Sequence, residues 1–253
     1  MSDNPLIRRV ASLIQSSRKI TILTGAGVSQ ESGVPTFRDA QDGLWAKYDP
    51  QQLATPEAFQ RNPKLVWDWY EFRREMVRKA KPNPGHFALV EIQKRYPGAK
   101  LITQNIDDLH EQAGSRQVIH LHGCLAENKC FQNCQGDPTP VDITQIQWDK
   151  TSGPPPCPYC GGWVRPNVVW FTEIVLSDCL QTAFQACQTC DLMLVVGTSG
   201  FVTPAATMPA YAKSAGAKIV EVNPDYTMIT RIVDIKLAGP SGQMLPLVVE
   251  ALG

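Results

Sequence analysis

The stretch Lys19–Ser29, with the sequence KITILTGAGVS, decides the fold of this chain. Its first half is an apolar run typical of a buried strand, and Gly25 and Gly27 follow directly. Glycines there let the backbone turn tightly and approach a phosphate, and the N-terminus of a following helix supplies N–H donors. The stretch therefore predicts the first strand–turn–helix unit of an α/β fold. The same glycine pattern also occurs at ordinary strand–helix turns, so it does not by itself establish a phosphate site.

Further short apolar runs follow along the chain, and helical stretches separate several of them. Residues 5–17, before the first strand, also carry apolar side chains at helical spacing. Strands that alternate with helices form parallel sheets covered on both faces. We therefore expect a Rossmann-like, doubly wound α/β sheet, with further strands at Lys100–Thr103, Val118–Leu121, Leu192–Val196 and Lys218–Val222.

Four of the eight cysteines form two close pairs. Three residues separate Cys130 from Cys134, and two separate Cys157 from Cys160. Two such pairs on separate turns can close a tetrahedron of thiolates around Zn²⁺. We expect a structural zinc site, because four thiolates leave no open position for water. The other cysteines have no assigned role, and the pair at 187 and 190 is expected in the core: Cys124, Cys179, Cys187 and Cys190.

Two segments interrupt the strand–helix alternation. Residues 40–85 read as helical and loop-rich, and residues 124–166 hold five cysteines and seven prolines. We expect them to build a smaller domain, with 40–85 as its helical module and 124–166 as its zinc-binding module. The Rossmann-like domain then consists of residues 1–39, 86–123 and 167–253.

The charge balance narrows the class of partner. The 253 residues include 24 basic and 24 acidic side chains, so the net charge is zero. This weakens a general nucleic-acid or membrane-surface function but allows one local anionic ligand. No apolar run is long enough to span a bilayer, and no signal peptide is recognisable. We expect a monomeric cytoplasmic protein, or an organelle-matrix protein that has lost a targeting peptide, with no nucleic-acid or membrane partner.

Polar residues follow several of the expected strands. Gln104, Asn105 and Asp107 come after one strand and His122 after the next, where ligands bind in open parallel sheets. His122 could act as a general base, but a histidine there could equally be structural, and Asn and Asp also suit caps and turns. Within residues 32–39, Arg38 could neutralise a phosphate and Phe37 could cover a flat ring. The third glycine of the dinucleotide-binding pattern is absent, so a standard dehydrogenase fits poorly.

The segment 63–79 has the spacing of an amphipathic helix. Arg73 falls inside its combined apolar face, near Tyr70, whereas Arg74 falls on the opposite side with Glu71, Glu75 and Arg78. An arginine on an apolar face needs an anionic partner, since an unpaired buried charge is costly. That partner is either an internal carboxylate or an anionic ligand.

Taken together, these motifs resemble the sirtuins, the NAD-dependent protein lysine deacylases. Matches occur in the family's order over nearly the whole chain. The first cysteine pair departs from the family pattern, in which two intervening residues are commonest. The spacing of Tyr70 and Arg73 also resembles the Tyr-x-x-Arg motif of class III sirtuins. The motifs that carry the resemblance are residues 25–29, 32–38, 103–107, 122–123, 197–199 and 222–223, together with the four paired cysteines.

The resemblance implies a mechanism. The acyl oxygen of a substrate lysine attacks the nicotinamide ribose of NAD, and His122 serves as general base while Asn105 and Gln104 order the ribose and a water. The products would be lysine, nicotinamide and O-acyl-ADP-ribose. Phe37 would screen the reactive sugar, and Ile106 and Asp107 would hold the carboxamide. The NAD-binding set would be Gly25, Ala26, Gly27, Phe37, Arg38, Gln104, Asn105, Ile106, Asp107, Gly197, Thr198, Ser199, Asn223 and Ser241.

The same resemblance implies an acyl-lysine peptide or protein as substrate. Val168, Val169, Trp170 and Phe171 would bind it by strand addition. Tyr70 and Arg73 would grip the carboxylate of a succinyl, malonyl or glutaryl group, since a guanidinium can hold a carboxylate through two hydrogen bonds. The alternatives are a deacetylase without acidic-acyl preference, a mono-ADP-ribosyltransferase, or a non-catalytic NAD-sensing or zinc-ribbon module.

Overall fold

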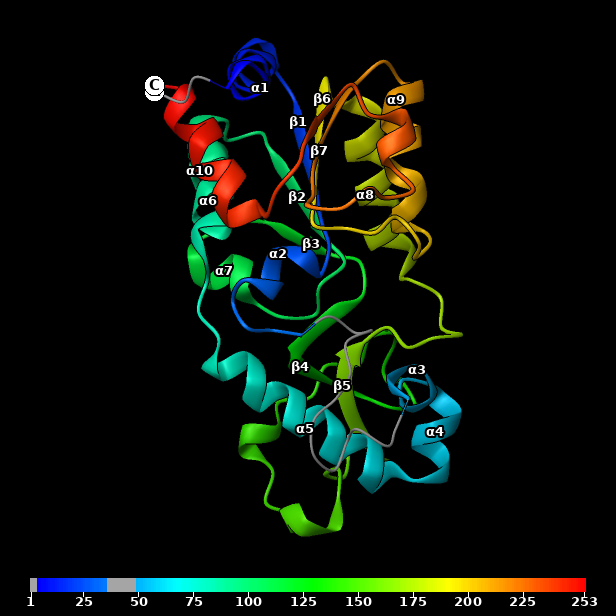
Figure 1. The fold of residues 1–253 in the computed structure, drawn as a ribbon. Coiled ribbons are helices and arrows are strands. Elements are labelled where there is room, and N and C mark those ends of the chain that lie inside the picture. The colour runs from blue at the N-terminus through cyan, green and yellow to red at the C-terminus, as the bar shows by residue number, and fades with distance from the viewer. Residues whose placement is uncertain (1–3, 36–48) are drawn as a thin grey trace.

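The larger part of the molecule is a parallel sheet with helices on both faces (Figure 1). The computed structural model describes residues 4–35 and 49–253. Within them, six parallel strands pair in the order β3-β2-β1-β6-β7-β8, which confirms the doubly wound α/β fold. Five of the strands were expected, β3 ends one residue early, and β8 was not predicted. Their bounds are β1 Ile20–Thr24, β2 Lys100–Thr103, β3 Val118–His120, β6 Leu192–Val196, β7 Lys218–Val222 and β8 Ile235–Leu237.

Alternation along each strand produces two separate apolar layers. Ile20 and Ile22 of β1 point into a core shared with α1, α6 and α10, whereas Leu23 points into the opposite core with α8 and α9. Both sides of the sheet are therefore buried, which is why the strands read as continuous apolar runs. The helices of this part are α1 Pro5–Ser16, α2 Gly27–Gln30, α6 Pro84–Arg95, α7 Leu109–Ala113, α8 Ser177–Thr189, α9 Met208–Ser214 and α10 Ser241–Ala251, with 3-10 turns η4 Ala205–Thr207 and η5 Thr230–Ile232.

The strand order fixes where a ligand can bind. Neighbours of β1 are β2 on one side and β6 on the other, so successive connections leave this point in opposite directions. Open α/β sheets bind ligands outside the carboxyl ends of the strands at such a switch point. The loop after β1, beginning at Gly25, and the loop after β6, beginning at Gly197, lie there side by side.

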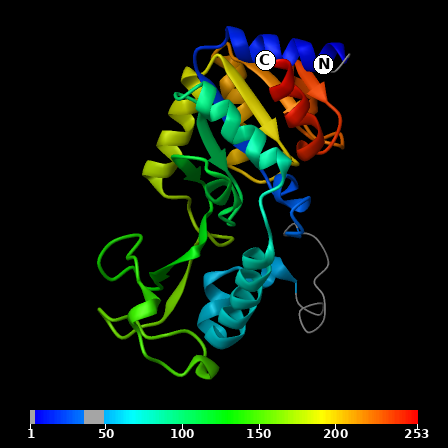
Figure 2. The ribbon, with the colours of Figure 1, turned by 90° about the vertical axis from the view of Figure 1, so that its left-hand side faces the viewer.

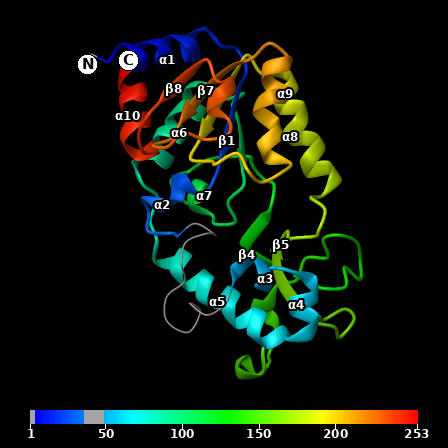
Figure 3. The ribbon, with the colours of Figure 1, turned by 45° about the vertical axis from the view of Figure 1, so that its right-hand side comes forward.

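A second part of the molecule lies beyond the carboxyl ends of the strands (Figures 2 and 3). It contains an antiparallel pair of strands packed against a long helix, and its core includes Phe59, Val66, Trp69 and Trp170. Its elements are α3 Pro50–Leu53, α4 Pro56–Arg61, α5 Pro63–Lys79, β4 Gly123–Cys130 and β5 Val164–Val168, with 3-10 turns η2 Ile143–Gln145 and η3 Lys150–Ser152.

The side of α5 assigned as polar is only partly so. Arg74 is 6% exposed: its Nε donates to the carbonyl of Leu125 at 2.8 Å, and its guanidinium also bonds Asn128 and Glu71. The prediction that Arg74 faces away from the packed side is therefore wrong. The helix is therefore packed beyond its apolar face, because the backbone and side chains of β4 bind Arg74.

We propose that residues 40–85 and 124–166 act as the small domain, with 1–39, 86–123 and 167–253 as the Rossmann-like domain. Gly123 pairs with Val168 at one end of the β4–β5 ladder, just outside the proposed boundaries. In the part of the chain that the structure describes, no helix is both long and apolar enough to cross a bilayer.

Candidate active site and metal site

The glycine loop packs directly against the loop after β6. The N–H of Gly25 donates to the Val196 carbonyl at 3.0 Å, and that of Gly27 to the Gly197 carbonyl at 2.8 Å. A Cβ on Gly25 or Gly27 would lie 2.8 Å from the Gly197 carbonyl oxygen. These glycines are therefore required by backbone packing at the switch point, whatever else the loop binds. The following helix α2 has only four residues, shorter than a phosphate-binding helix of a dehydrogenase.

A cavity of about 1380 Å³ opens between this loop pair and the small part. Its volume exceeds the roughly 300–1,000 Å³ of a pocket for one drug-sized ligand, so it has room for two reactants together. It brings together all the predicted NAD and substrate residues that the structure describes: Gly25, Ala26, Gly27, Gln104, Asn105, Ile106, Asp107, His122, Gly197, Thr198, Ser199, Asn223 and Ser241, with Tyr70, Arg73, Val168, Val169, Trp170 and Phe171. Phe37 and Arg38 lie outside the described residues.

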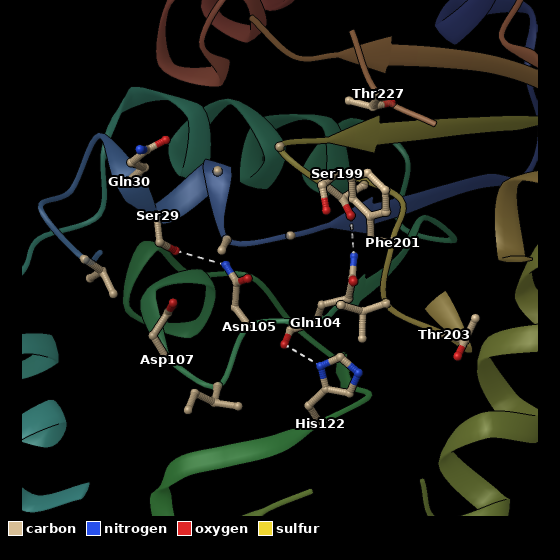
Figure 4. Close-up of a pocket in the computed structure, with 18 of the residues that line it drawn as sticks. Ser29, Gln30, Gln104, Asn105, Asp107, His122, Ser199, Phe201, Thr203 and Thr227 are labelled. Atoms are coloured by element: carbon tan, nitrogen blue, oxygen red, sulfur yellow. Dashed lines mark hydrogen bonds between the residues drawn. The ribbon is translucent and has the colours of Figure 1, made fainter. Parts of the chain in front are cut away.

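The ring of His122 is held in one tautomer. Its Nδ1 lies 2.9 Å from the carbonyl oxygen of Gln104, as Figure 4 shows. Because a carbonyl only accepts, Nδ1 carries the hydrogen, and Nε2 keeps its lone pair in the neutral ring. Burial lowers the pKa of His122, and the bond to Gln104 only partly opposes this. The histidine is thus a neutral imidazole with a basic nitrogen, which is the form that a general base needs.

The loop after β2 is fixed by a network of side chains. The Gln104 amide donates to Thr198 Oγ1 at 2.8 Å, and Asn105 Nδ2 donates to Ser29 Oγ at 3.1 Å (Figure 4). The backbone N–H of Asn105 also donates to Thr103 Oγ1. These bonds join the loops after β1, β2 and β6 into one polar surface, so amide and carboxylate groups from distant parts of the sequence converge there.

Asp107 is an unusual carboxyl group in this surface. It is 5% exposed, and burial raises its pKa. Hydrogen bonds from the Leu109 N–H and the Ser29 hydroxyl lower the pKa, but by less. Ser29 itself was not assigned to the site, although it directly follows the glycine loop. The cavity wall formed by the turn between β7 and β8 was also missed, because β8 was not predicted; it includes Asp225, Thr227 and Arg231.

The far wall of the cavity holds Tyr70 and Arg73, the two residues expected to contact the acyl group. Tyr70 and Arg73 are 1% and 6% exposed. Trp170 Nε1 donates to the Tyr70 hydroxyl oxygen at 2.8 Å, and the Arg73 guanidinium lies over the Trp69 ring, 5.4 Å from its centroid. Burial raises the pKa of Tyr70, so the hydroxyl is protonated at neutral pH and can donate.

The four predicted zinc ligands converge. The sulfurs of Cys130, Cys134, Cys157 and Cys160 all lie within 4.8 Å of one another. The closest pairs are Cys130–Cys160 at 3.6 Å and Cys134–Cys157 at 3.9 Å, close to the edges of a tetrahedron with Zn–S bonds of about 2.3 Å. The longer first turn therefore still closes the site. A cluster of four thiols at these spacings fits a structural zinc ion, and its four ligands leave no place for a reacting water.

Comparisons with known proteins agree with this geometry. The model of the Sir2 family matches residues 25–204. NAD-dependent protein deacylase 1 of Pseudomonas aeruginosa is 49% identical over 242 residues, covering 95% of this chain and 96% of that protein. NAD-dependent protein deacylase of Pyrococcus abyssi is 47% identical over 245 residues, 97% of each chain.

Solved structures give the same result. A Sir2 homologue in complex with NAD superposes with a TM-score of 0.86 and 43% identity, covering 96% of this chain and 93% of that one. A Sir2 protein with a deacetylated p53 peptide and 3′-O-acetyl ADP-ribose has a TM-score of 0.81 and 33% identity, covering 96% and 97%. The fold, the converged cavity and these similarities lead to one conclusion: the chain belongs to the Sir2 family of NAD-dependent protein deacylases.

Proposed function

We propose that this chain removes negatively charged acyl groups, such as succinyl, malonyl and glutaryl, from protein lysine while consuming NAD. The observation that carries the proposal is that Tyr70 and Arg73 line the same cavity as His122. A basic nitrogen and a cationic clamp in one cavity suit an acyl-lysine whose acyl group ends in a carboxylate. NAD supplies the ribose carbon that accepts the acyl oxygen, and the chain supplies binding, orientation and proton transfer.

His122 is the proposed general base. Its Nδ1 hydrogen is held by the Gln104 carbonyl, so Nε2 is the atom that can take a proton from a ribose hydroxyl. Asn105 and Gln104 are proposed to order the ribose and a water, since both are already fixed by Ser29 and Thr198. The predicted roles of Gly25, Ala26, Gly27, Ile106, Asp107, Gly197, Thr198, Ser199, Asn223 and Ser241 in NAD binding rest on their shared place in the cavity wall.

The substrate peptide is proposed to bind beside Val168–Phe171. This segment is held in place by backbone hydrogen bonds, because the N–H of Val169 donates to the His122 carbonyl and that of Phe171 to the Ala54 carbonyl. An acyl-lysine that enters next to it would pass between His122 and the Tyr70 wall. The solved Sir2 structure with a deacetylated p53 peptide supports a peptide substrate for this chain.

Arg73 is the proposed specificity residue. Burial lowers its pKa, and the nearby Tyr70 and Asp107 side chains only partly oppose this effect. If no substrate carboxylate pairs with Arg73, Asp107 is the internal carboxylate available to do so. A substrate carboxylate could accept two N–H groups of the Arg73 guanidinium at once. Such a two-bond contact is stronger and more specific than a single charge-assisted hydrogen bond.

The test is kcat/KM on matched succinyl-lysine and acetyl-lysine peptides, for the wild type and Arg73→Met. We expect the wild type to prefer the succinyl peptide and the variant to lower the succinyl-to-acetyl ratio by roughly 10- to 100-fold, as for loss of a charged hydrogen-bonded contact of about 1.5–3 kcal/mol. Arg78→Met is the control, since Arg78 is an exposed residue of the same helix.

Other outcomes would contradict the proposal in distinct ways. A wild type that prefers acetyl-lysine would indicate a deacetylase with a structural Arg73. Transfer of labelled ADP-ribose to protein without deacylation would indicate a mono-ADP-ribosyltransferase. A His122→Ala variant that still forms the deacylated peptide at the wild-type rate would remove His122 from the mechanism.

A further inference from the structure

The hydroxyl of Tyr70 is oriented by a neighbour that the clamp motif does not include. The Trp170 indole N–H donates to it at 2.8 Å, although 100 residues separate the two in sequence. We propose that Trp170, held by the ion pair of Arg165 and Glu173, is a positioning residue that sets the selectivity for acidic acyl groups by aiming the Tyr70 hydroxyl. The proposal rests on the proposed function and adds residues to its specificity site.

The ion pair is built to hold the indole ring rigidly. Arg165 is 1% exposed, and its two terminal nitrogens donate to the two carboxylate oxygens of Glu173 at 2.6 and 3.0 Å. Its guanidinium carbon lies 3.2 Å from the centroid of the Trp170 ring. Glu173 closes the loop, because its second oxygen accepts the backbone N–H of Trp170 at 2.8 Å.

Further bonds tie this unit to β5. The guanidinium also donates to the carbonyl of Val168 at 2.5 Å and, through Nε, to that of Pro166 at 3.3 Å. Most of the five N–H groups of the buried Arg165 guanidinium therefore have acceptors. A buried ion pair that is satisfied in this way can fix the geometry of its neighbours. The position of the indole nitrogen is thus fixed by contacts that do not involve the substrate.

The bond from Trp170 determines what Tyr70 can do. A phenol has one hydrogen, and its oxygen accepts from the indole, so the hydroxyl hydrogen must point elsewhere. The Tyr70 and Trp170 rings lie nearly parallel, with centroids 6.3 Å apart and 25° between their planes, and the Trp69 edge meets Tyr70 from another side. The ring cannot turn away, so the hydrogen is directed within the cavity wall that also carries Arg73.

An acidic acyl group uses this arrangement, and an acetyl group does not. The distal carboxylate can accept the Tyr70 hydrogen together with the Arg73 bonds, whereas the acetyl methyl group has no acceptor. Losing the indole N–H should therefore weaken succinyl-lysine binding more than acetyl-lysine binding. Because the indole N–H acts through the Tyr70 hydroxyl, this weakening of succinyl-lysine binding should disappear in a protein whose residue 70 has no hydroxyl.

A double-mutant cycle tests this coupling. The variants are Trp170→Phe, Tyr70→Phe and both together, assayed for kcat/KM on succinyl- and acetyl-lysine peptides. We expect Trp170→Phe to lower the succinyl-to-acetyl ratio by about 3- to 10-fold, mainly through the KM of the succinyl peptide, as for the loss of one hydrogen bond. In the Tyr70→Phe background the same change should alter the ratio by less than about 2-fold.

The controls separate orientation from packing. Trp67→Phe makes the same substitution on α5 at a buried tryptophan in the cluster around the cysteines, and should leave the ratio unchanged. If Trp170→Phe does not fold, replacing the indole by the isosteric benzothiophene amino acid removes only the N–H. Equal effects of Trp170→Phe in both backgrounds, or no effect in either, would overturn the inference. A wild type without succinyl preference would instead overturn the proposed function.

Discussion

At the scale of single residues, the cavity wall contains a strained backbone position. Thr172 has a φ of 75°, in the left-handed region that glycine adopts easily and a β-branched residue does not. The strain follows from its neighbours: the N–H of Phe171 is bound to Ala54, and Glu173 turns back so that its carboxylate reaches Arg165. The Arg165–Glu173 ion pair that holds Trp170 is therefore accompanied by an unfavourable backbone conformation at Thr172, next to Glu173.

We expect Thr172→Gly to stabilise the protein by about 0.5–1 kcal/mol, because relief of about 1–2 kcal/mol of left-handed strain exceeds the greater freedom of glycine in the unfolded chain. The measurement is the free energy of unfolding in urea. Thr182→Gly, at an exposed position of α8, is the matched control and should destabilise the protein slightly, by about 0.3 kcal/mol, the difference between the helix propensities of threonine and glycine. A loss of stability at Thr172 would show that its conformation carries no strain.

At the scale of elements, the start of α6 depends on a neutral histidine. Asn83 caps the helix, and the Nδ1 atom of His86 accepts the Asn83 N–H at 3.3 Å, which completes a capping box. His86 is fully buried, and its ring lies 4.9 Å from that of His110, which bonds Thr24 at the end of β1. Protonation of His86 would remove the acceptor and place a cation beside a second buried ring.

This environment predicts a loss of stability in acid. Burial lowers the pKa of His86 to about 4 and that of His110 to about 3, from an ordinary value of 6.5. Between pH 6.5 and about 4 the unfolded chain binds more protons than the folded one, so stability is present above pH 6.5 and falls as the pH drops. We expect His86→Gln to reduce this loss by about 1–3 kcal/mol between pH 7 and pH 4.5.

Urea unfolding of the wild type and of His86→Gln at pH 7 and pH 4.5 measures how much stability each loses. Carboxylate groups titrate in both proteins, so their effects cancel when the two losses are compared. His120→Gln is the control, since burial lowers the pKa of His120 but Glu111 raises it above its usual value overall. The charged form of His120 therefore favours folding, and its removal should steepen the acid loss. Identical pH slopes for the wild type and His86→Gln would contradict the prediction.

At the scale of the whole molecule, the cysteine cluster and the cavity both contact the helix α5. Trp67 of α5 packs with Cys130, Cys157 and Val164 around the cysteine cluster, and three residues further along the same helix lies Tyr70. The cysteine cluster thus packs against the same helix that contributes Tyr70 and Arg73 to the cavity wall.

We expect one zinc ion per chain, and we expect Cys157→Ser to lose it and to lower the melting temperature, because a four-thiolate site contributes several kcal/mol to folding. Zinc content and thermal melts with and without a strong chelator measure both effects. Cys179→Ser is the control, since Cys179 lies outside the cluster and should retain the zinc. A chelated protein with unchanged zinc-module stability would show that the cysteines do not hold a structural metal.

Much of this architecture could be read from local sequence. The strand runs at β1, β2, β6 and β7 are continuous apolar stretches because helices cover both faces of the sheet, and the burial of Ile20, Ile22 and Leu23 confirms that reason. The cysteine spacing likewise predicted the metal cluster, because ligands on a tight turn are close wherever the turn is placed. The apolar runs and the two close cysteine pairs are therefore recognisable locally, although the two pairs converge only in the fold.

Other features depended on distant parts of the chain. The strand β8 is only three residues long and is stabilised by pairing with β7, and the burial of Arg74 depends on β4, about 50 residues further on. The bonds from Asn105 to Ser29 and from Trp170 to Tyr70 join residues 76 and 100 positions apart. The sequence alone thus determined the layered sheet, the glycine loop and the metal ligands, whereas only the tertiary structure decided which side chains orient one another, because hydrogen-bond geometry across loops is set by packing and not by spacing.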